Sequence, residues 1–204
     1  MNLPNSLTVT RIFLVPLLVV ALLTKVKGHL ILGVPKEIVG AAIFGLASLT
    51  DWADGYLARR RKQITPLGQM IDPLADKLLT LAALISLVQL DLAPAWMVAV
   101  ILGRDFAVTG LRGLAYARGI AVPASPLGKI KMVAQVVAIL ALILAHGSMR
   151  AWYLDRIGEG ALWVAVLTAL ASAADYFRRF SGVLHPGVAT FPAARDQRPD
   201  RKAG

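Results

Sequence analysis

The chain has 204 residues, of which 57% are hydrophobic and 17% charged, yet its formal net charge is +10. Soluble domains carry about 25% charged residues and disordered chains are poor in apolar ones, so neither class fits, and a soluble nucleic-acid-binding protein has no use for so many long apolar runs. An integral membrane protein accounts for both numbers if the cations gather on one side of the bilayer. The chain has no cysteine, which excludes disulfides, thiolate metal sites and cysteine nucleophiles.

Six apolar segments approach the length of about 20 residues that a helix needs to cross a hydrocarbon core about 30 Å thick. They are Leu7–Leu23, Ile38–Leu57, Gln69–Leu90, Pro94–Leu114, Leu127–Ala145 and Gly160–Phe177. None of them alternates polar and apolar residues as a barrel strand does. We therefore expect an all-α integral membrane protein with six transmembrane helices in residues 1–182. A basic, disordered cytoplasmic tail is expected over residues 183–204.

Lysine and arginine are divided unevenly among the connections. Fifteen lie near the chain ends or around the connections that follow the second and fourth segments, and five lie around the remaining connections. Because cytoplasmic loops of membrane proteins carry an excess of cations, both termini and those two connections are expected on the cytoplasmic side. For any single loop cation, attraction to anionic lipid is an equally simple explanation.

Four of the 12 acidic residues fall inside or at the ends of the second and third segments: Asp51, Asp54, Asp72 and Asp76. An acid within a membrane span costs about 2.5–3.5 kcal/mol, so four of them require compensation. The members of each pair are three or four residues apart and share one helix face. The short connection over 60–68 makes the two helices antiparallel neighbours. We therefore expect the four carboxylates to converge at the cytoplasmic end.

Oxygen-only ligation suits a hard divalent cation, Mg²⁺ or Mn²⁺, and four carboxylates are enough for two ions. Two such ions beside a membrane indicate phosphoryl chemistry. For any one of these acids alone, a helix-end position at the level of the headgroups explains it as well. From a different class of function, a divalent-cation transporter would use the same acids, but it requires them near mid-membrane and the cations at 59–62 would repel its substrate.

The spacing from Asp51 to Asp76 reads D-x2-D-G-x2-A-R-x8-G-x3-D-x3-D. It resembles the signature of the CDP-alcohol phosphatidyltransferase family in full. Three further stretches, 2–11, 103–112 and 128–131, resemble the bacterial branch of that family that uses glycerol 3-phosphate. The last two segments and the tail carry no matching motif.

The resemblance implies a six-helix membrane enzyme of the bacterial cytoplasmic membrane, with its active site on the cytoplasmic side, acting as a homodimer. Its substrates would be CDP-diacylglycerol and glycerol 3-phosphate, and its products phosphatidylglycerol phosphate and CMP. Inositol phosphate and serine are the alternative acceptors. A scaffold protein without catalytic activity is hard to reconcile with an intact eight-residue signature.

The resemblance also implies a role for each matching residue. The metal ligands would be Asp51, Asp54, Asp72 and Asp76, with Asp76 also serving as general base. The CDP-lipid site would be formed by Asn5, Thr8, Gly55, Ala58, Arg59 and Gly68. Physical chemistry supports part of this set, because glycine permits close approach of a ligand and the arginine fork suits a phosphate oxygen.

A phosphate-bearing acceptor needs its own cationic site. Arg104 lies within the fourth segment, where an arginine is costly and functional by default, although a structural pair with Asp105 is the alternative. Arg112, Lys129 and Lys131 lie at the cytoplasmic ends of the fourth and fifth segments and complete the expected glycerol-phosphate site. For these three, extension of the side chain to the membrane interface is an equally good explanation.

Overall fold

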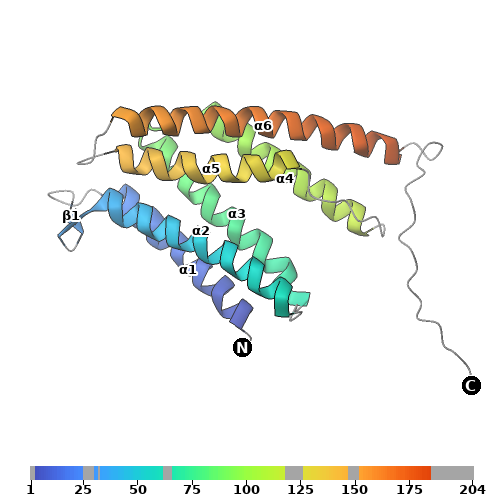
Figure 1. Cartoon of the computed structure of the whole chain (residues 1–204), viewed down its shortest axis with the longest axis horizontal. Helices are drawn as coiled ribbons and strands as arrows, with labels where there is room; N and C mark the ends of the chain where they lie inside the picture. The colour runs from blue at the N-terminus through green and yellow to red at the C-terminus, as the bar shows by residue number, and fades with distance from the viewer. Residues whose placement is uncertain are drawn as a thin grey trace, which may run out of the picture.

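A computed structural model describes the backbone of residues 3–24, 30–31, 33–61, 66–117, 126–146 and 152–184, and the side chains of 12–24, 31, 33–50, 77–113, 127–146 and 152–178. These residues form six helices and two short strands (Figure 1): α1 (Leu3–Leu23), β1 (Leu30–Ile31), β2 (Val34–Pro35), α2 (Lys36–Arg61), α3 (Pro66–Gln89), α4 (Ala95–Ala117), α5 (Pro126–Ala145) and α6 (Trp152–Leu184). Each apolar segment predicted from the sequence lies in its own helix, apart from one terminal residue in two of them. The helical prediction is therefore confirmed.

Two local features differ from the sequence-based expectation. Strands β1 and β2 pair antiparallel, Leu30 with Pro35 and Ile31 with Val34, where only a connection was expected. Gly33 at the turn has a φ of 81°, which glycine adopts without a steric penalty. Helix α6 begins at Trp152 rather than at Gly160, because the charged residues of its first turns lower the hydropathy without interrupting the helix.

The turn between α3 and α4 is closed by backbone hydrogen bonds. Asp91, with a φ of 57°, donates its N–H to the carbonyl of Val88 at 3.1 Å, and Leu92 donates to Leu87 at 2.9 Å. This left-handed residue followed by a six-to-one bond is a Schellman motif, which satisfies the last carbonyls of α3. The carbonyl of Pro94 then accepts from Met97 at 3.1 Å and starts α4.

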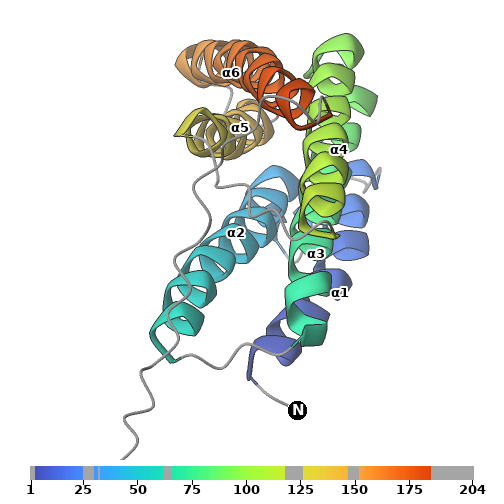
Figure 2. The ribbon, with the colours of Figure 1, turned by 90° about the vertical axis from the view of Figure 1, so that its right-hand side faces the viewer.

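The helices pack unevenly. The most extensive contact joins α5 and α6, while α1 lies against both α2 and α3, and α4 lies against α6. Figure 2 shows the α5–α6 pair on one side of α2, with α4 running past both layers. Helices α2 and α3 are consecutive but contact one another weakly, since each makes its larger contact with α1. The two helices are antiparallel neighbours, as expected, but α1 is the larger packing partner of each.

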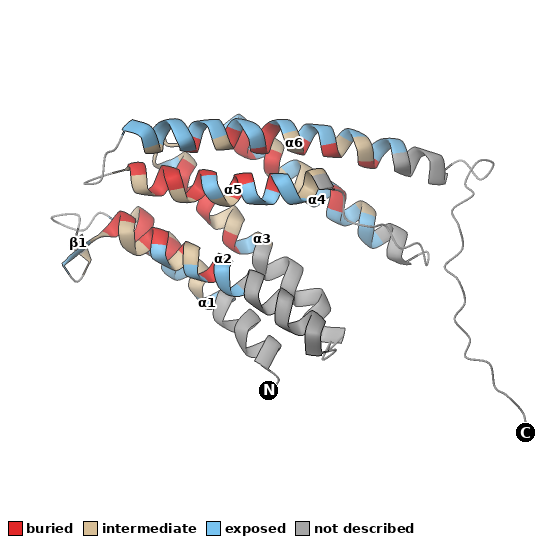
Figure 3. Cartoon of the chain, viewed as in Figure 1, coloured by how far each residue is buried: buried red, intermediate tan, exposed pale blue. Residues whose placement is uncertain are grey.

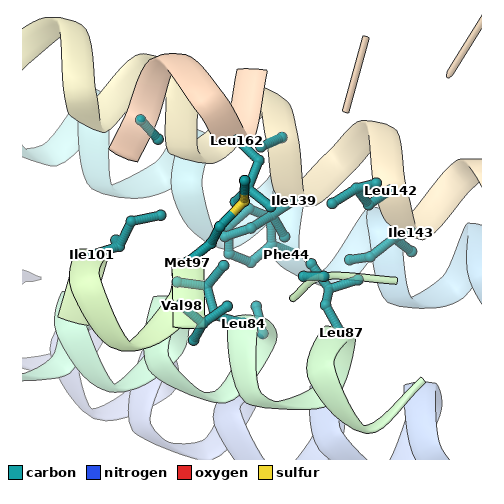
Figure 4. Packing of buried hydrophobic residues seen from close by; sticks show 14 of the residues in the cluster. Phe44, Leu84, Leu87, Met97, Val98, Ile101, Ile139, Leu142, Ile143 and Leu162 are labelled. Carbon is teal, nitrogen blue, oxygen red and sulfur yellow. The ribbon is translucent and has the colours of Figure 1, made fainter. Parts of the chain in front are cut away.

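All six helices contribute to one apolar core (Figures 3 and 4). Its buried side chains include Leu18 and Leu22 of α1, Phe44 of α2, Leu84 and Leu87 of α3, Met97 and Ile101 of α4, Ile139 and Ile143 of α5, and Leu162 and Val166 of α6. Burying an aliphatic or aromatic side chain of this size stabilises the fold by about 1.5–3 kcal/mol relative to exposure in water. The contacts of this core fix the arrangement of the helices that carry the site.

The outer faces of the helices are also apolar. Phe13 of α1 is 72% exposed, Leu46 of α2 64% and Val133 of α5 64%. In the part of the chain whose side chains are described, two helical stretches, Leu127–Ala145 and Trp152–Arg178, are long and apolar enough to cross a membrane. A protein with apolar outer faces and such helices fits a lipid environment. The count of six spans stays a prediction.

Gly158 brings α6 close to α5, and we expect its replacement to weaken the fold. A Cβ at Gly158 would lie 2.7 Å from Cγ of Leu142 and 3.2 Å from its backbone nitrogen, whereas a Cβ at Gly160 meets nothing within 4 Å. Gly158→Ala should lower the free energy of unfolding by about 1–3 kcal/mol. Gly160→Ala, the matched control, should leave it unchanged or raise it, because alanine favours helix. Denaturation in mixed detergent micelles measures both, and equal effects would contradict the close approach.

Candidate active site

The four aspartates of the signature lie in helical backbone. Asp51 and Asp54 belong to α2, and Asp72 and Asp76 to α3, so the premise that each pair shares a helix face is met. Figure 1 places the carboxyl end of α2 and the amino end of α3 at the same end of the molecule. The aspartate side chains lie outside the described residues. Their convergence on one point therefore stays a prediction.

The residues expected to bind the CDP-lipid are helical as well. Asn5 and Thr8 lie in the first turns of α1, which begins at Leu3. Gly55, Ala58 and Arg59 lie in α2 and Gly68 in α3. The amino end of α1 lies at the same end of the molecule as the aspartates (Figure 1), and α1 packs against both helices that carry them. The side chains of these residues are outside the described set, so their contacts stay predictions.

A group of polar side chains joins α4, α5 and α6, and we call Arg104, Asp105, Lys131, Ser172 and Tyr176 the α4–α6 polar cluster. Nη1 of Arg104 donates to Oδ1 of Asp105 at 3.2 Å, and Nζ of Lys131 forms an ion pair with the other carboxylate oxygen, Oδ2. The side chains of Arg104 and Asp105 are 11% and 15% exposed, and that of Lys131 5%. One carboxylate therefore holds two buried cations side by side.

Helix α6 supplies the rest of this cluster. Nε of Arg104 donates to Oγ of Ser172 at 2.9 Å, and Nη2 of the same guanidinium donates to the same oxygen. The guanidinium carbon also lies 5.9 Å from the centre of the Tyr176 ring. Sequence reasoning missed both α6 residues. The available signal was Ser172, a polar residue within a run of alanine and leucine on the last predicted segment.

Two of the four cations expected at the acceptor site thus lie together, and two do not. Arg104 and Lys131 meet at Asp105, so the structural pair that was the alternative for Arg104 is present. Lys131 is buried, which contradicts extension of its side chain to the interface. Arg112 of α4 and Lys129 of α5 are exposed.

Three of the five N–H groups that a guanidinium carries are used by Ser172 and Asp105. Two N–H groups of Arg104 thus have no partner among the described residues. These two donors lie in a largely buried position. An anionic ligand would bind them strongly there, because charge-assisted hydrogen bonds strengthen when they are desolvated.

Residues 1–171 match the family model described as CDP-alcohol phosphatidyltransferase. A protein of Bacillus subtilis named CDP-diacylglycerol--glycerol-3-phosphate 3-phosphatidyltransferase is 47% identical over 183 residues, which cover 87% of this chain and 94% of that protein. Proteins with the same name from Rickettsia felis and Pseudomonas fluorescens are 37% and 33% identical, each over 87% of this chain and over 94% and 89% of their own lengths. The chain therefore belongs to the CDP-alcohol phosphatidyltransferase family.

Proposed function

We propose that this protein transfers the phosphatidyl group of CDP-diacylglycerol to glycerol 3-phosphate and releases CMP. The observation that carries the proposal is the complete D-x2-D-G-x2-A-R-x8-G-x3-D-x3-D signature, which lies on the consecutive helices α2 and α3. The carboxyl end of α2 and the amino end of α3 lie at the same end of the molecule (Figure 1). Relatives that bear this activity in their names, at up to 47% identity over most of the chain, support it. Membership of the family disfavours the cation-transporter alternative.

The donor set fits two Mg²⁺ or Mn²⁺ ions, held by Asp51, Asp54, Asp72 and Asp76. All four donors are carboxylates, which hard divalent cations prefer, and they lie on consecutive helices that reach the same end of the molecule. When bound, such ions neutralise the diphosphate and withdraw charge from the phosphorus under attack.

The protein's own residues bind the CDP-lipid and move the proton. Arg59 holds diphosphate oxygens, while Gly55 and Gly68 let the nucleotide approach the helices closely. Ala58 is a small neighbour of the same site, and Asn5 and Thr8 contact the nucleotide from α1. Asp76 accepts the proton of the attacking hydroxyl, so that the alkoxide replaces CMP on the phosphorus.

The acceptor phosphate binds beside the α4–α6 polar cluster. Arg104 keeps two N–H groups for it, and Lys131 adds a second cation at the shared carboxylate. The exposed cations Arg112 and Lys129 guide the dianion toward this position from the cytoplasm. The two substrate sites then lie on different helices, the donor on α1 to α3 and the acceptor on α4 and α5.

The proposal also includes the topology. Six spans, both termini in the cytoplasm and a basic tail over 183–204 follow from the hydropathy and the uneven division of cations. The apolar outer faces of α1, α2 and α5 suit contact with lipid. A homodimer in the bacterial cytoplasmic membrane is proposed from the family.

The choice of acceptor is tested by an assay of CMP release. Purified protein in lipid vesicles is given CDP-diacylglycerol, Mg²⁺ and one alcohol at a time: glycerol 3-phosphate, inositol phosphate or serine. We expect release with glycerol 3-phosphate alone. Release with another alcohol would change the acceptor, and uptake of metal into sealed vesicles without any CMP release would favour a transporter.

Replacing Arg104 should weaken binding of the acceptor specifically. Loss of charge-assisted hydrogen bonds to a phosphate predicts that Arg104→Ala raises the KM for glycerol 3-phosphate roughly 10- to 100-fold. The KM for CDP-diacylglycerol should change little. Arg112→Ala should raise the same KM by a smaller factor, because Arg112 is exposed. Unchanged KM values in both variants would move the phosphate site elsewhere.

A further inference from the structure

The α6 residues Ser172 and Tyr176 hold Arg104 in a defined orientation. They lie four residues apart, which places them on one face of the helix, and both are buried, with 0% and 6% of their surface exposed. The stretch that matches the family model ends at residue 171, so the match itself assigns them nothing. Arg104 reaches both from α4.

The hydroxyl of Ser172 has partners on both α6 and α4. It donates to the carbonyl of Ala169 at 3.4 Å, one turn earlier in α6. Its lone pairs are then available to the guanidinium, and they accept from both Nε and Nη2 of Arg104. One oxygen of α6 thus binds one edge of the guanidinium, the edge formed by Nε and Nη2.

Tyr176 restricts the remaining freedom of the guanidinium. Its ring centre lies 5.9 Å from the guanidinium carbon, within the distance of about 6 Å at which cation–π attraction acts. Asp105 of α4 accepts from Nη1 of the same guanidinium at 3.2 Å. The side chain of Arg104 is therefore held by contacts from two helices rather than by one partner.

We infer that Ser172 and Tyr176 are positioning residues for the transferase reaction, which act by orienting toward the phosphate of the acceptor the two N–H groups of Arg104 that have no partner among the described residues. This inference rests on the acceptor role proposed above for Arg104. Orienting an arginine before the ligand arrives lowers the entropy lost on binding. The specificity of this enzyme for a phosphate-bearing alcohol then depends on α6 as well as on α4 and α5.

Steady-state kinetics with glycerol 3-phosphate test the inference. Ser172→Ala removes the oxygen that accepts from Arg104 and should raise the KM for glycerol 3-phosphate roughly tenfold, with kcat and the KM for CDP-diacylglycerol within about a factor of two. Tyr176→Leu should raise the same KM roughly threefold, and Tyr176→Phe, which keeps a ring, should raise it less. Thr168→Ala, one turn earlier in α6, is the matched control, since among the described residues that hydroxyl bonds the backbone carbonyls of Val164 and Ala165 and no side chain.

A double-variant cycle separates positioning from a structural role. In the Arg104→Ala background, adding Ser172→Ala should leave the KM for glycerol 3-phosphate unchanged, because the side chain that Ser172 orients is gone. If Ser172→Ala lowered kcat and raised both KM values together, or if its effect persisted without Arg104, the positioning role would be overturned. If Arg104→Ala raised the KM while Ser172→Ala and Tyr176→Leu did not, the inference alone would fail. If Arg104→Ala had no effect, the acceptor role of Arg104 would fail as well.

Discussion

Asp76→Asn should reduce turnover by a factor of about 10²–10⁴, the range that a general base contributes, if Asp76 is the base proposed above. The amide keeps the size of the side chain and one oxygen donor, but it has no capacity to take a proton from the hydroxyl of glycerol 3-phosphate. Affinity for CDP-diacylglycerol should therefore be largely retained. Single-turnover release of CMP measures the chemical step, and titration with CDP-diacylglycerol measures the binding.

The control for this variant is Asp91→Asn, the same change at an exposed position in the α3–α4 turn. Asparagine tolerates the left-handed backbone of Asp91, so activity should be unchanged. A residual rate in Asp76→Asn above about a tenth of the wild-type rate would exclude general-base catalysis by this residue. The loss would then be less than about tenfold, which is smaller than the contribution of a general base.

Removal of divalent metal should abolish the reaction. Four carboxylates beside a diphosphate repel one another strongly unless cations neutralise them. A chelator is expected to reduce CMP release by a factor of more than about 10³, which is the loss of several kcal/mol of charge stabilisation. Added Mg²⁺ or Mn²⁺ should restore the rate.

High concentrations of a monovalent salt are the control for metal removal. They screen charge but do not coordinate two phosphate oxygens at once, so they should not restore the activity of chelated enzyme. Full activity in the presence of chelator would show that the aspartates act by another route than metal binding.

The helices were predictable because hydropathy reports burial in lipid or in a core. All six apolar segments lie in helices, and the segment Leu127–Ala145 matches α5 to within one residue. The start of α6 was missed because Asp155, Arg156 and Glu159 lower the hydropathy of a stretch that is nevertheless helical. Helix α6 spans about 50 Å at 1.5 Å per residue, longer than the hydrocarbon core that a hydropathy window detects.

The packing of the helices was less predictable than their positions. A short connection predicts that α2 and α3 run antiparallel, but it does not decide which neighbour each helix packs against. In the structure α1 makes the larger contact with both. The choice depends on how the side chains of three helices fit together, and a single apolar pattern does not encode it.

The residues of the candidate site were also predictable only in part. Spacing within a helix relates Asp51 to Asp54 and Asp72 to Asp76, and the charge within a span marks Arg104. Ser172 and Tyr176 carry neither a paired spacing nor a charge within a span, because their importance arises from contacts with Arg104 on another helix. Contacts of that kind depend on the tertiary fold, so only the structure reveals them.

The proposed mechanism requires that the four aspartates form one metal site on α2 and α3. Binding of Mn²⁺, followed by electron paramagnetic resonance in the presence of CDP-diacylglycerol, tests it directly on the wild-type protein and on the variant with all four aspartates replaced by asparagine. We expect about two bound Mn²⁺ ions per wild-type chain, the number that a two-metal phosphoryl-transfer site holds, and none in the variant. Equal binding of Mn²⁺ by the two proteins would contradict it.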